Sequence, residues 1–100
     1  MSLLFTPLAE QDLEAIGNYI ARDNPRRALT FIREIRQQCK QISERPTTYL
    51  LRSEVGANIR SCVFGRYVIY FAAIDESVRI VRILHGAMDV NSNFDSRNYS

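Results

Sequence analysis

The stretch from Arg66 to Gly86, RYVIYFAAIDESVRIVRILHG, constrains the fold more than any other part of the chain. Residues 67–74 and 78–84 are rich in β-branched and aromatic side chains, and the segment 75–77, DES, has the chemistry of a turn. This pattern predicts a β-hairpin. Because two strands alone are only marginally stable in water, the hairpin needs a cover over one face and partners at its edges.

The length of 100 residues suits one domain, and hydrophobic and charged contents of 46% and 24% are typical of a folded globular chain. No apolar run approaches the roughly 18 residues that suggest a membrane span. The N-terminus lacks the basic start and long apolar core of a signal peptide. We therefore expect a cytoplasmic protein with a single domain over residues 1–90 and a flexible polar tail over residues 91–100.

Two helices are predicted ahead of the hairpin, over about residues 7–22 and 25–44. Each is introduced by a capping side chain followed by proline, with Thr6 before the first helix and Asn24 before the second. Apolar residues recur at steps of three and four through both segments, and Pro46 ends the second. Because the connection between them is short, we expect an antiparallel helical hairpin.

The remaining segments complete the predicted sheet. Residues 58–64 alternate well enough for a strand, which turns at Gly65 into the β-hairpin, and Leu3–Phe5 is a short N-terminal strand able to pair with a sheet edge. Residues 47–56 have no clear period and are expected to form a loop. We predict an α+β fold in which the N-terminal strand and the antiparallel helical hairpin pack on a three- to four-stranded antiparallel sheet.

The two helices carry opposite charge. Residues 7–23 hold one basic and four acidic residues, with Glu10, Asp12 and Glu14 near the positive end of the first helix, whereas residues 26–45 hold six basic and two acidic residues. One interpretation is a solvated hairpin with exposed pairs, each worth about 0–1 kcal/mol. The other is that the basic second helix faces an acidic partner.

Few groups for catalysis are present. The chain has no GxSxG, no glycine-rich phosphate loop and no HExxH motif, and His85 is its only histidine. Cys39 and Cys62 fall in a predicted helix and strand without CxxC spacing, so both are expected to be buried free thiols. Too few ligands exist for a metal site, and no cofactor or catalytic residue is predicted. Cleavage of RNA stays open, because arginines and tyrosines can hold phosphate.

Basic side chains lie on or near the predicted strands: Arg60, Arg66, Arg79, Arg82 and His85. Alternation along the last strand predicts two mixed faces, one with Arg79, Val81, Ile83 and His85 and one with Val78, Ile80, Arg82 and Leu84. The arginines are either solvated or paired with Glu54, Asp75 and Glu76, or they form a binding surface for an acidic or apolar segment of another protein.

Residues near the C-terminal end have two interpretations as well. His85 precedes a glycine at the end of a strand, where a structural histidine is more common than a catalytic one. Met88 and Phe94 are either anchors for a partner or covers for the sheet edge.

The order of these features resembles the ParE branch of the RelE/ParE toxins of bacterial toxin–antitoxin modules. The matching segments are DLEAIGNYI, NPRRALTFIREI, YVIYF and VRIVRILHGAMD, and they span about Leu4 to Asp89. The NPxxA helix start and the LHG near the end are the most telling parts of this resemblance. It implies two helices packed on an antiparallel sheet, a toxin neutralised by a ParD-like antitoxin, and DNA gyrase as the target. A heterotetramer or larger complex with the antitoxin is an assembly that the resemblance allows.

The resemblance also helps to choose between branches. RelE-type nucleases, which cut mRNA in the ribosome, carry arginines at positions that align here with Tyr67 and Met88, and lysines ahead of this strand. Neither Tyr67 nor Met88 supplies the fixed positive charge that phosphoryl transfer needs, and Lys40, the one lysine, lies in a predicted helix. If the alignment with the nucleases is shifted by one residue, Arg66 replaces Tyr67 at the first of the two arginine positions.

Three hypotheses follow: a gyrase inhibitor that acts by binding, a ribosome-dependent mRNA endoribonuclease, and an antitoxin-bound module with weak or lost toxicity. No sequence-specific binding of nucleic acid and no membrane contact are expected. In each case we expect the antitoxin's amphipathic helix or extended segment on apolar surface left by the hairpin and sheet, with its acidic residues meeting arginines. The candidate antitoxin- or target-binding residues are Arg33, Arg36, Arg60, Tyr67, Arg82, His85 and Met88.

Overall fold

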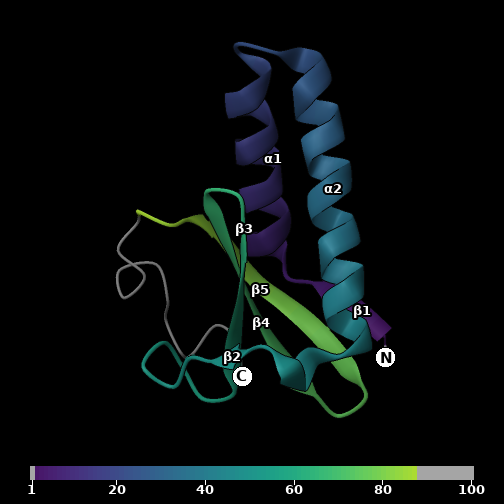
Figure 1. Cartoon of the computed structure of the whole chain (residues 1–100), viewed down its shortest axis with the longest axis vertical. Coiled ribbons are helices and arrows are strands. Elements are labelled where there is room, and N and C mark those ends of the chain that lie inside the picture. Colours follow the sequence, from purple (N-terminus) through teal and green to yellow (C-terminus); the bar gives the residue numbers. More distant parts are fainter. Residues whose placement is uncertain (1, 88–100) are drawn as a thin grey trace.

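Strands β4 and β5 form the centre of the molecule, and the other elements are arranged around them (Figure 1). A computed structural model describes residues 2–87. In chain order its elements are β1 (Ser2–Phe5), α1 (Pro7–Ala21), α2 (Pro25–Glu44), a 3-10 turn η1 (Pro46–Thr48), β2 (Leu50–Leu51), β3 (Ile59–Phe64), β4 (Tyr67–Ile74) and β5 (Ser77–His85). The predicted helices and main strands are therefore confirmed to within a residue or two.

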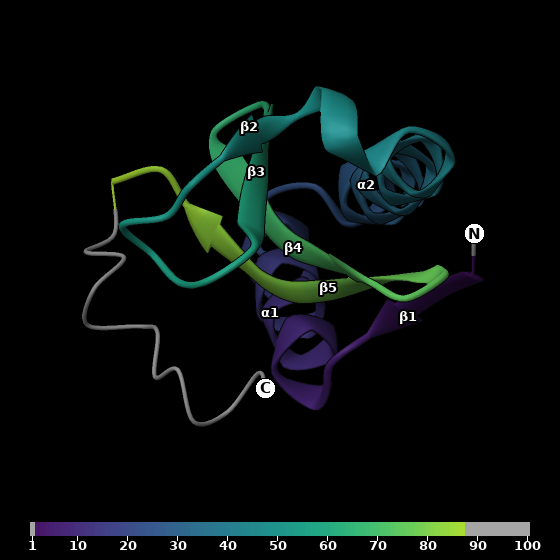
Figure 2. The same ribbon diagram turned by 90° about the horizontal axis from the view of Figure 1, so that it is seen from below.

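The sheet has five strands in the order β1-β5-β4-β3-β2 and is mixed (Figure 2). The pairs β2–β3, β3–β4 and β4–β5 are antiparallel, whereas β1 runs parallel to β5. The prediction of three to four antiparallel strands was close but missed two features. Strand β2 lies inside the predicted loop and has only two residues, too few for an alternating pattern, and the direction of β1 depends on a pairing across some 75 residues of chain.

Tight turns join the central strands. Gly65 and Asp75 have positive φ angles of 59° and 56°, which tight hairpin turns require and which glycine, asparagine and aspartate tolerate best. Ile74 pairs with Ser77 across the second turn, so this turn has two central residues and Ser77 already belongs to β5. The local turn signals in the sequence therefore set the register of the meander.

Both predicted helix caps are present. The Thr6 hydroxyl accepts a hydrogen bond from the Ala9 amide at 3.0 Å and donates one to the Val81 carbonyl at 2.8 Å. The Asn24 side chain accepts from the Arg27 amide at 3.0 Å. Thr6 thus ties the start of α1 to strand β5 as well as capping it.

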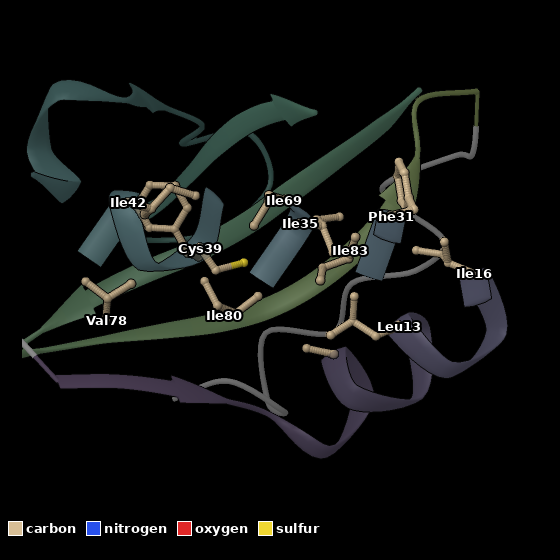
Figure 3. Packing of buried hydrophobic residues seen from close by; sticks show 12 residues of the cluster. Leu13, Ile16, Phe31, Ile35, Cys39, Ile42, Ile69, Val78, Ile80 and Ile83 are labelled. Carbon is tan, nitrogen blue, oxygen red and sulfur yellow. The ribbon is translucent and has the colours of Figure 1, made fainter. Parts of the chain in front are cut away.

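A single core cluster joins both helices to one face of β4 and β5 (Figure 3). Its buried members are Ala9, Leu13, Ile16, Phe31, Ile35, Cys39, Ile42, Ile69, Phe71, Val78, Ile80 and Ile83. The opposite face of the sheet carries a smaller cluster of Ile59, Tyr70, Ala72, Val81 and Leu84. The helical hairpin therefore covers one face of the sheet, as predicted.

A β-bulge changes which residues of β5 share a face. The register between β4 and β5 shifts at Tyr70 and Phe71, which pair with Arg82 and Ile80 and leave Val81 as the extra residue. The predicted grouping of Val81 with Ile83 was therefore wrong, because the extra residue inverts the alternation beyond Ile80. Ile83 joins Val78 and Ile80 on the helix side, and Leu84 joins Val81 on the other.

Two predictions for the thiols and the C-terminal end have different outcomes. Cys39 is buried, but Cys62 is only half-buried, because β2 covers β3 only at Arg60 and Ser61 and leaves the rest of that strand at the edge. Met88, Phe94 and the predicted tail of residues 91–100 lie outside the described residues. Within residues 2–87, neither helix is long and apolar enough to cross a lipid bilayer.

Candidate functional site

The outer side of the helical hairpin holds a largely apolar groove. It has a volume of about 600 Å³ and runs between α1 and α2, whose connecting loop projects beyond the sheet (Figure 1). Leu29, 70% exposed, stands on its rim. A methyl group on Gly17 would lie 3.5 Å from Ile32, so the glycine leaves the floor of the groove open. The apolar lining is completed by Leu13, Ala21, Pro25 and Ala28.

An exposed ion pair closes one end of this groove. The Arg36 guanidinium donates two hydrogen bonds to the Glu10 carboxylate, at 3.1 and 2.9 Å. These bonds hold the pKa of Glu10 below its ordinary value and raise that of Arg36. Arg36 also lies 5.1 Å from the centre of the Phe5 ring, a cation–π distance. The predicted binding residue Arg36 is thus already fixed against both α1 and β1.

Three predicted binding residues meet at a second, smaller hollow. Tyr67, Arg82 and His85 line a cavity of about 200 Å³ together with α1 residues, including Tyr19. The rings of Tyr67 and His85 are T-shaped, with centres 5.5 Å apart, and the Tyr67 ring lies 5.6 Å from Phe31. Burial raises the pKa of Tyr67, so at neutral pH this phenol is an uncharged donor.

The positive charge of Arg82 is balanced by the carboxylate of Asp12. The Asp12 carboxylate accepts hydrogen bonds from Nε and Nη2 of Arg82 and from the Ile83 amide, all at 2.9 Å. Both side chains are largely buried, at 13% and 14% exposure. The predicted partners of the strand arginines were Glu54, Asp75 and Glu76, and for Arg82 this was wrong. Glu54 pairs with Arg52 instead.

The two cysteines are poor candidates for nucleophiles. Burial raises the pKa of Cys39 to about 12 and that of Cys62 above its ordinary value, so neither thiol is a ready nucleophile at neutral pH. Nδ1 of His85 accepts a hydrogen bond from the Ala87 amide at 3.1 Å. Among residues 2–87 no group of three or more histidine, cysteine, aspartate and glutamate side chains is placed to hold a metal ion.

The remaining predicted residues are dispersed. Arg33 is exposed on α2, on the same helix as Arg36. Arg60 lies on β3 and donates a hydrogen bond of 2.7 Å to the Tyr49 carbonyl, which fixes the chain ahead of β2. Met88 lies outside the described residues. The fold therefore collects Tyr67, Arg82 and His85 at one place, Arg33 and Arg36 at another, and leaves Arg60 apart.

Sequence reasoning missed several residues of these surfaces. Glu10 and Asp12 were interpreted as favourable charges at a helix start, whereas each neutralises an arginine from a distant element. Leu29 was not selected, although its position beside Ala28, off the apolar stripe, was a signal for an exposed leucine. Tyr19 gave no signal of its own, because its neighbours Tyr67 and His85 are distant in sequence.

Comparison with solved structures shows that this architecture recurs. A chain of the chromosomal ParDE toxin–antitoxin system from P. aeruginosa superposes with a TM-score of 0.76. It is 24% identical to the present chain, and the match covers 85% of this chain and 95% of that one. At this level of identity the similarity establishes a shared fold: two helices on a small mixed sheet.

The sequence itself identifies the family. The family model of the ParE toxin of the type II toxin–antitoxin system parDE matches residues 3–90. The chain therefore belongs to the ParE toxin family. A search of curated proteins gives no match.

Proposed function

We propose that this protein is a toxin that binds and inhibits DNA gyrase in the cytoplasm, and that a ParD-like antitoxin neutralises it. The observation that carries the proposal is the ParE family match over residues 3–90, which spans every described element except the first residue of β1. The structural neighbour from P. aeruginosa comes from a system that pairs ParE with ParD. An antitoxin of that kind is accordingly the expected partner.

The described side chains favour binding over cleavage. Phosphoryl transfer needs a positive charge aimed at the developing oxyanion. The arginine that lines the same hollow as Tyr67 and His85 is Arg82, and its guanidinium is engaged by the Asp12 carboxylate at 2.9 Å. A toxin that acts through its surface needs no such group, and the groove between α1 and α2 offers the kind of apolar surface that an amphipathic helix recognises.

A supercoiling assay tests the proposal. Purified protein is added to gyrase and relaxed plasmid, and supercoiling is expected to fall as the toxin is titrated, then to recover when the antitoxin is added. A parallel reaction without gyrase shows whether the toxin alters the plasmid by itself. Unchanged supercoiling at a large molar excess of folded toxin would contradict the proposal.

Two further readouts separate the alternatives. Cleaved mRNA in a translating extract, lost in the His85→Ala variant, would indicate an endoribonuclease of the RelE type. Harmless expression in bacteria together with tight antitoxin binding would indicate a module with little toxicity. For a gyrase inhibitor we expect growth arrest or filamentation with signs of DNA damage and intact mRNA.

A further inference from the structure

The hollow that Tyr19, Tyr67 and His85 line, here called the aromatic hollow, lies on a different side of α1 from the groove between the helices. Its α1 residues are at positions 12, 15, 16 and 19, which recur at helical steps of three and four. None of its lining residues also lines the groove between α1 and α2. Helix α1 therefore separates two surfaces, one largely apolar and one aromatic.

Two rings of the aromatic hollow are already held in place. The Tyr67 ring lies 5.6 Å from the Phe31 ring and 5.5 Å from the His85 ring. Tyr19, in contrast, is 66% exposed. A side chain that is fixed before binding loses little freedom when a partner docks. Tyrosines at the centre of protein interfaces also contribute a large share of the binding energy.

The polar groups of the aromatic hollow are mainly hydrogen-bond donors. The hydroxyls of Tyr19 and Tyr67 make no hydrogen bond within residues 2–87. Nδ1 of His85 accepts a hydrogen bond from a backbone amide, so Nε2 carries the ring proton and can donate. The carboxylate in the lining, that of Asp12, is occupied by Arg82 and a β5 amide. A ligand with acceptor groups therefore fits better than one with donors.

Two arginines make the surroundings of the hollow positive. Arg66 lies beside Tyr67 and opposes the rise in the pKa of that phenol, which burial causes and the Tyr19 phenol increases. Arg22 follows Tyr19 by three positions, so the two are neighbours on the surface of α1. Both arginines are exposed, and neither makes an ion pair with another described residue. The rim therefore favours an anionic occupant.

We propose that the aromatic hollow is the surface through which the toxin binds gyrase, and that it receives a gyrase loop carrying an aspartate or glutamate. The carboxylate of that loop accepts hydrogen bonds from the phenols and pairs with Arg66, while its apolar neighbours pack on the Tyr19 ring. The inference rests on the proposed function, since it assumes that gyrase is the target.

The number of free cations favours a protein loop over nucleic acid. Tight binding of a nucleic acid backbone uses a row of arginines and lysines, each against a phosphate. The aromatic hollow has two such cations at its rim, whereas a single carboxylate needs one guanidinium and a few donors. A second copy of the toxin would bring identical cationic rims together around a two-fold axis, which is repulsive.

A double substitution at the hollow tests the proposal. We expect Tyr19→Ala, Arg66→Glu to require about tenfold or more toxin than wild type for half-inhibition of gyrase supercoiling. Its direct binding to purified gyrase should also depend less on salt. The matched control is Val63→Ala, Arg45→Glu, because both side chains are exposed and neither lines the hollow. The control should inhibit gyrase as wild type does.

Binding of the antitoxin shows whether the effect is specific. The antitoxin purified from the open reading frame next to the toxin gene should bind the Tyr19→Ala, Arg66→Glu toxin as tightly as wild type, because the groove between the helices is unchanged. Equal inhibition of gyrase by this variant and the control would overturn the inference. Loss of antitoxin binding in a variant with an unchanged circular dichroism spectrum and melting temperature would also overturn it, in favour of an antitoxin surface.

Two further outcomes are distinct. Tight binding of a single-stranded oligonucleotide by the wild-type toxin without gyrase, lost in the double variant, would overturn the inference in favour of a nucleic acid site. A wild-type toxin that does not inhibit gyrase would refute the proposed function, and the inference with it. Retained inhibition by the double variant refutes only the assignment of the surface.

Discussion

The Asp12 carboxylate accepts three hydrogen bonds from β5 and its arginine, in a position shielded from most solvent. Removing one partner of a buried ion pair leaves the other charge without compensation, and the penalty exceeds what the pair itself contributes. We therefore regard Asp12 and Arg82 as the connection that fixes α1 against the bulge in β5.

Substitution of Asp12 should be strongly destabilising. We expect Asp12→Ala to lower the free energy of unfolding by about 3 kcal/mol, measured by urea denaturation at pH 7. Glu14→Ala is the matched control on the same helix, because Glu14 is exposed and makes no ion pair with a described residue. The control should change the stability by less than about 0.5 kcal/mol. Similar values for both variants would show that the Asp12–Arg82 pair does not hold the helix.

The exposed ion pair between Glu10 and Arg36 should make the stability of the protein depend on pH. The pKa of Glu10 lies below its ordinary value of 4.5 in the folded protein, because Arg36 donates hydrogen bonds to the carboxylate. The unfolded state therefore takes up a proton first as the pH falls, and the stabilisation present above pH 4.5 disappears as the pH drops through the folded pKa.

The test compares wild type with Glu10→Gln. Near pH 7 the variant should be less stable by up to about 1 kcal/mol, the upper value for exposed pairs. The difference should shrink as the pH falls below 4.5 and vanish once the Glu10 carboxyl is protonated in the folded protein. A difference that does not change as the pH falls would assign it to packing and not to charge.

Among the elements, helix α1 carries a glycine, Gly17, where it faces Ile32 of α2. A helical glycine costs roughly 1 kcal/mol relative to alanine, through the freedom of the unfolded chain. A methyl group added at Gly17 would meet Ile32 at 3.5 Å, an ordinary van der Waals contact. The glycine is thus a source of instability that the packing does not require.

Gly17→Ala should therefore stabilise the protein, by about 0.5–1 kcal/mol in thermal or urea unfolding. Gly65→Ala provides the contrast, because Gly65 has a φ of +59° in the turn between β3 and β4. There alanine should destabilise by about 1 kcal/mol or more. A loss of stability in Gly17→Ala would mean that the helices cannot accommodate the contact with Ile32.

For the molecule as a whole, stability depends on one core cluster that spans the helices and the central strands. Phe71 is fully buried in it, and its ring is T-shaped to that of Tyr49, with centres 5.7 Å apart. The 3-10 turn and β2 therefore attach to the same core as the helices. Loss of this side chain opens a cavity that several elements share.

Phe71→Ala should lower the free energy of unfolding by about 3–5 kcal/mol, a large part of the total of a small domain. Val63→Ala, at a side chain that is 73% exposed on the neighbouring strand, should cost less than about 0.5 kcal/mol. Both are measured by chemical denaturation with circular dichroism. If Phe71→Ala lowers the free energy of unfolding no more than Val63→Ala does, the stability of the protein does not depend on this core cluster.

Much of the fold was predictable because its signals are local. Thr6 and Asn24 cap the helices as their side chains predict, and Gly65 supplies the turn conformation expected of it. The candidate site was less predictable. Tyr67, Arg82 and His85 lie together, but Arg36 and Arg82 have partners, Glu10 and Asp12, that no local pattern connects to them.

The sequence by itself determined the two helices, the main strands, the helical hairpin and the family, because capping, periodicity and turn chemistry act between residues a few positions apart. Only the tertiary structure decided the parallel direction of β1, the bulge at Val81 and the pairing of Asp12 with Arg82. Each of these depends on contacts between segments separated by about 70 residues or more, or on competition between packing and register, and no local pattern encodes such contacts. For the same reason, the groove between α2 and β1, which Arg33, Arg36 and Lys40 line, could be recognised only from the tertiary structure.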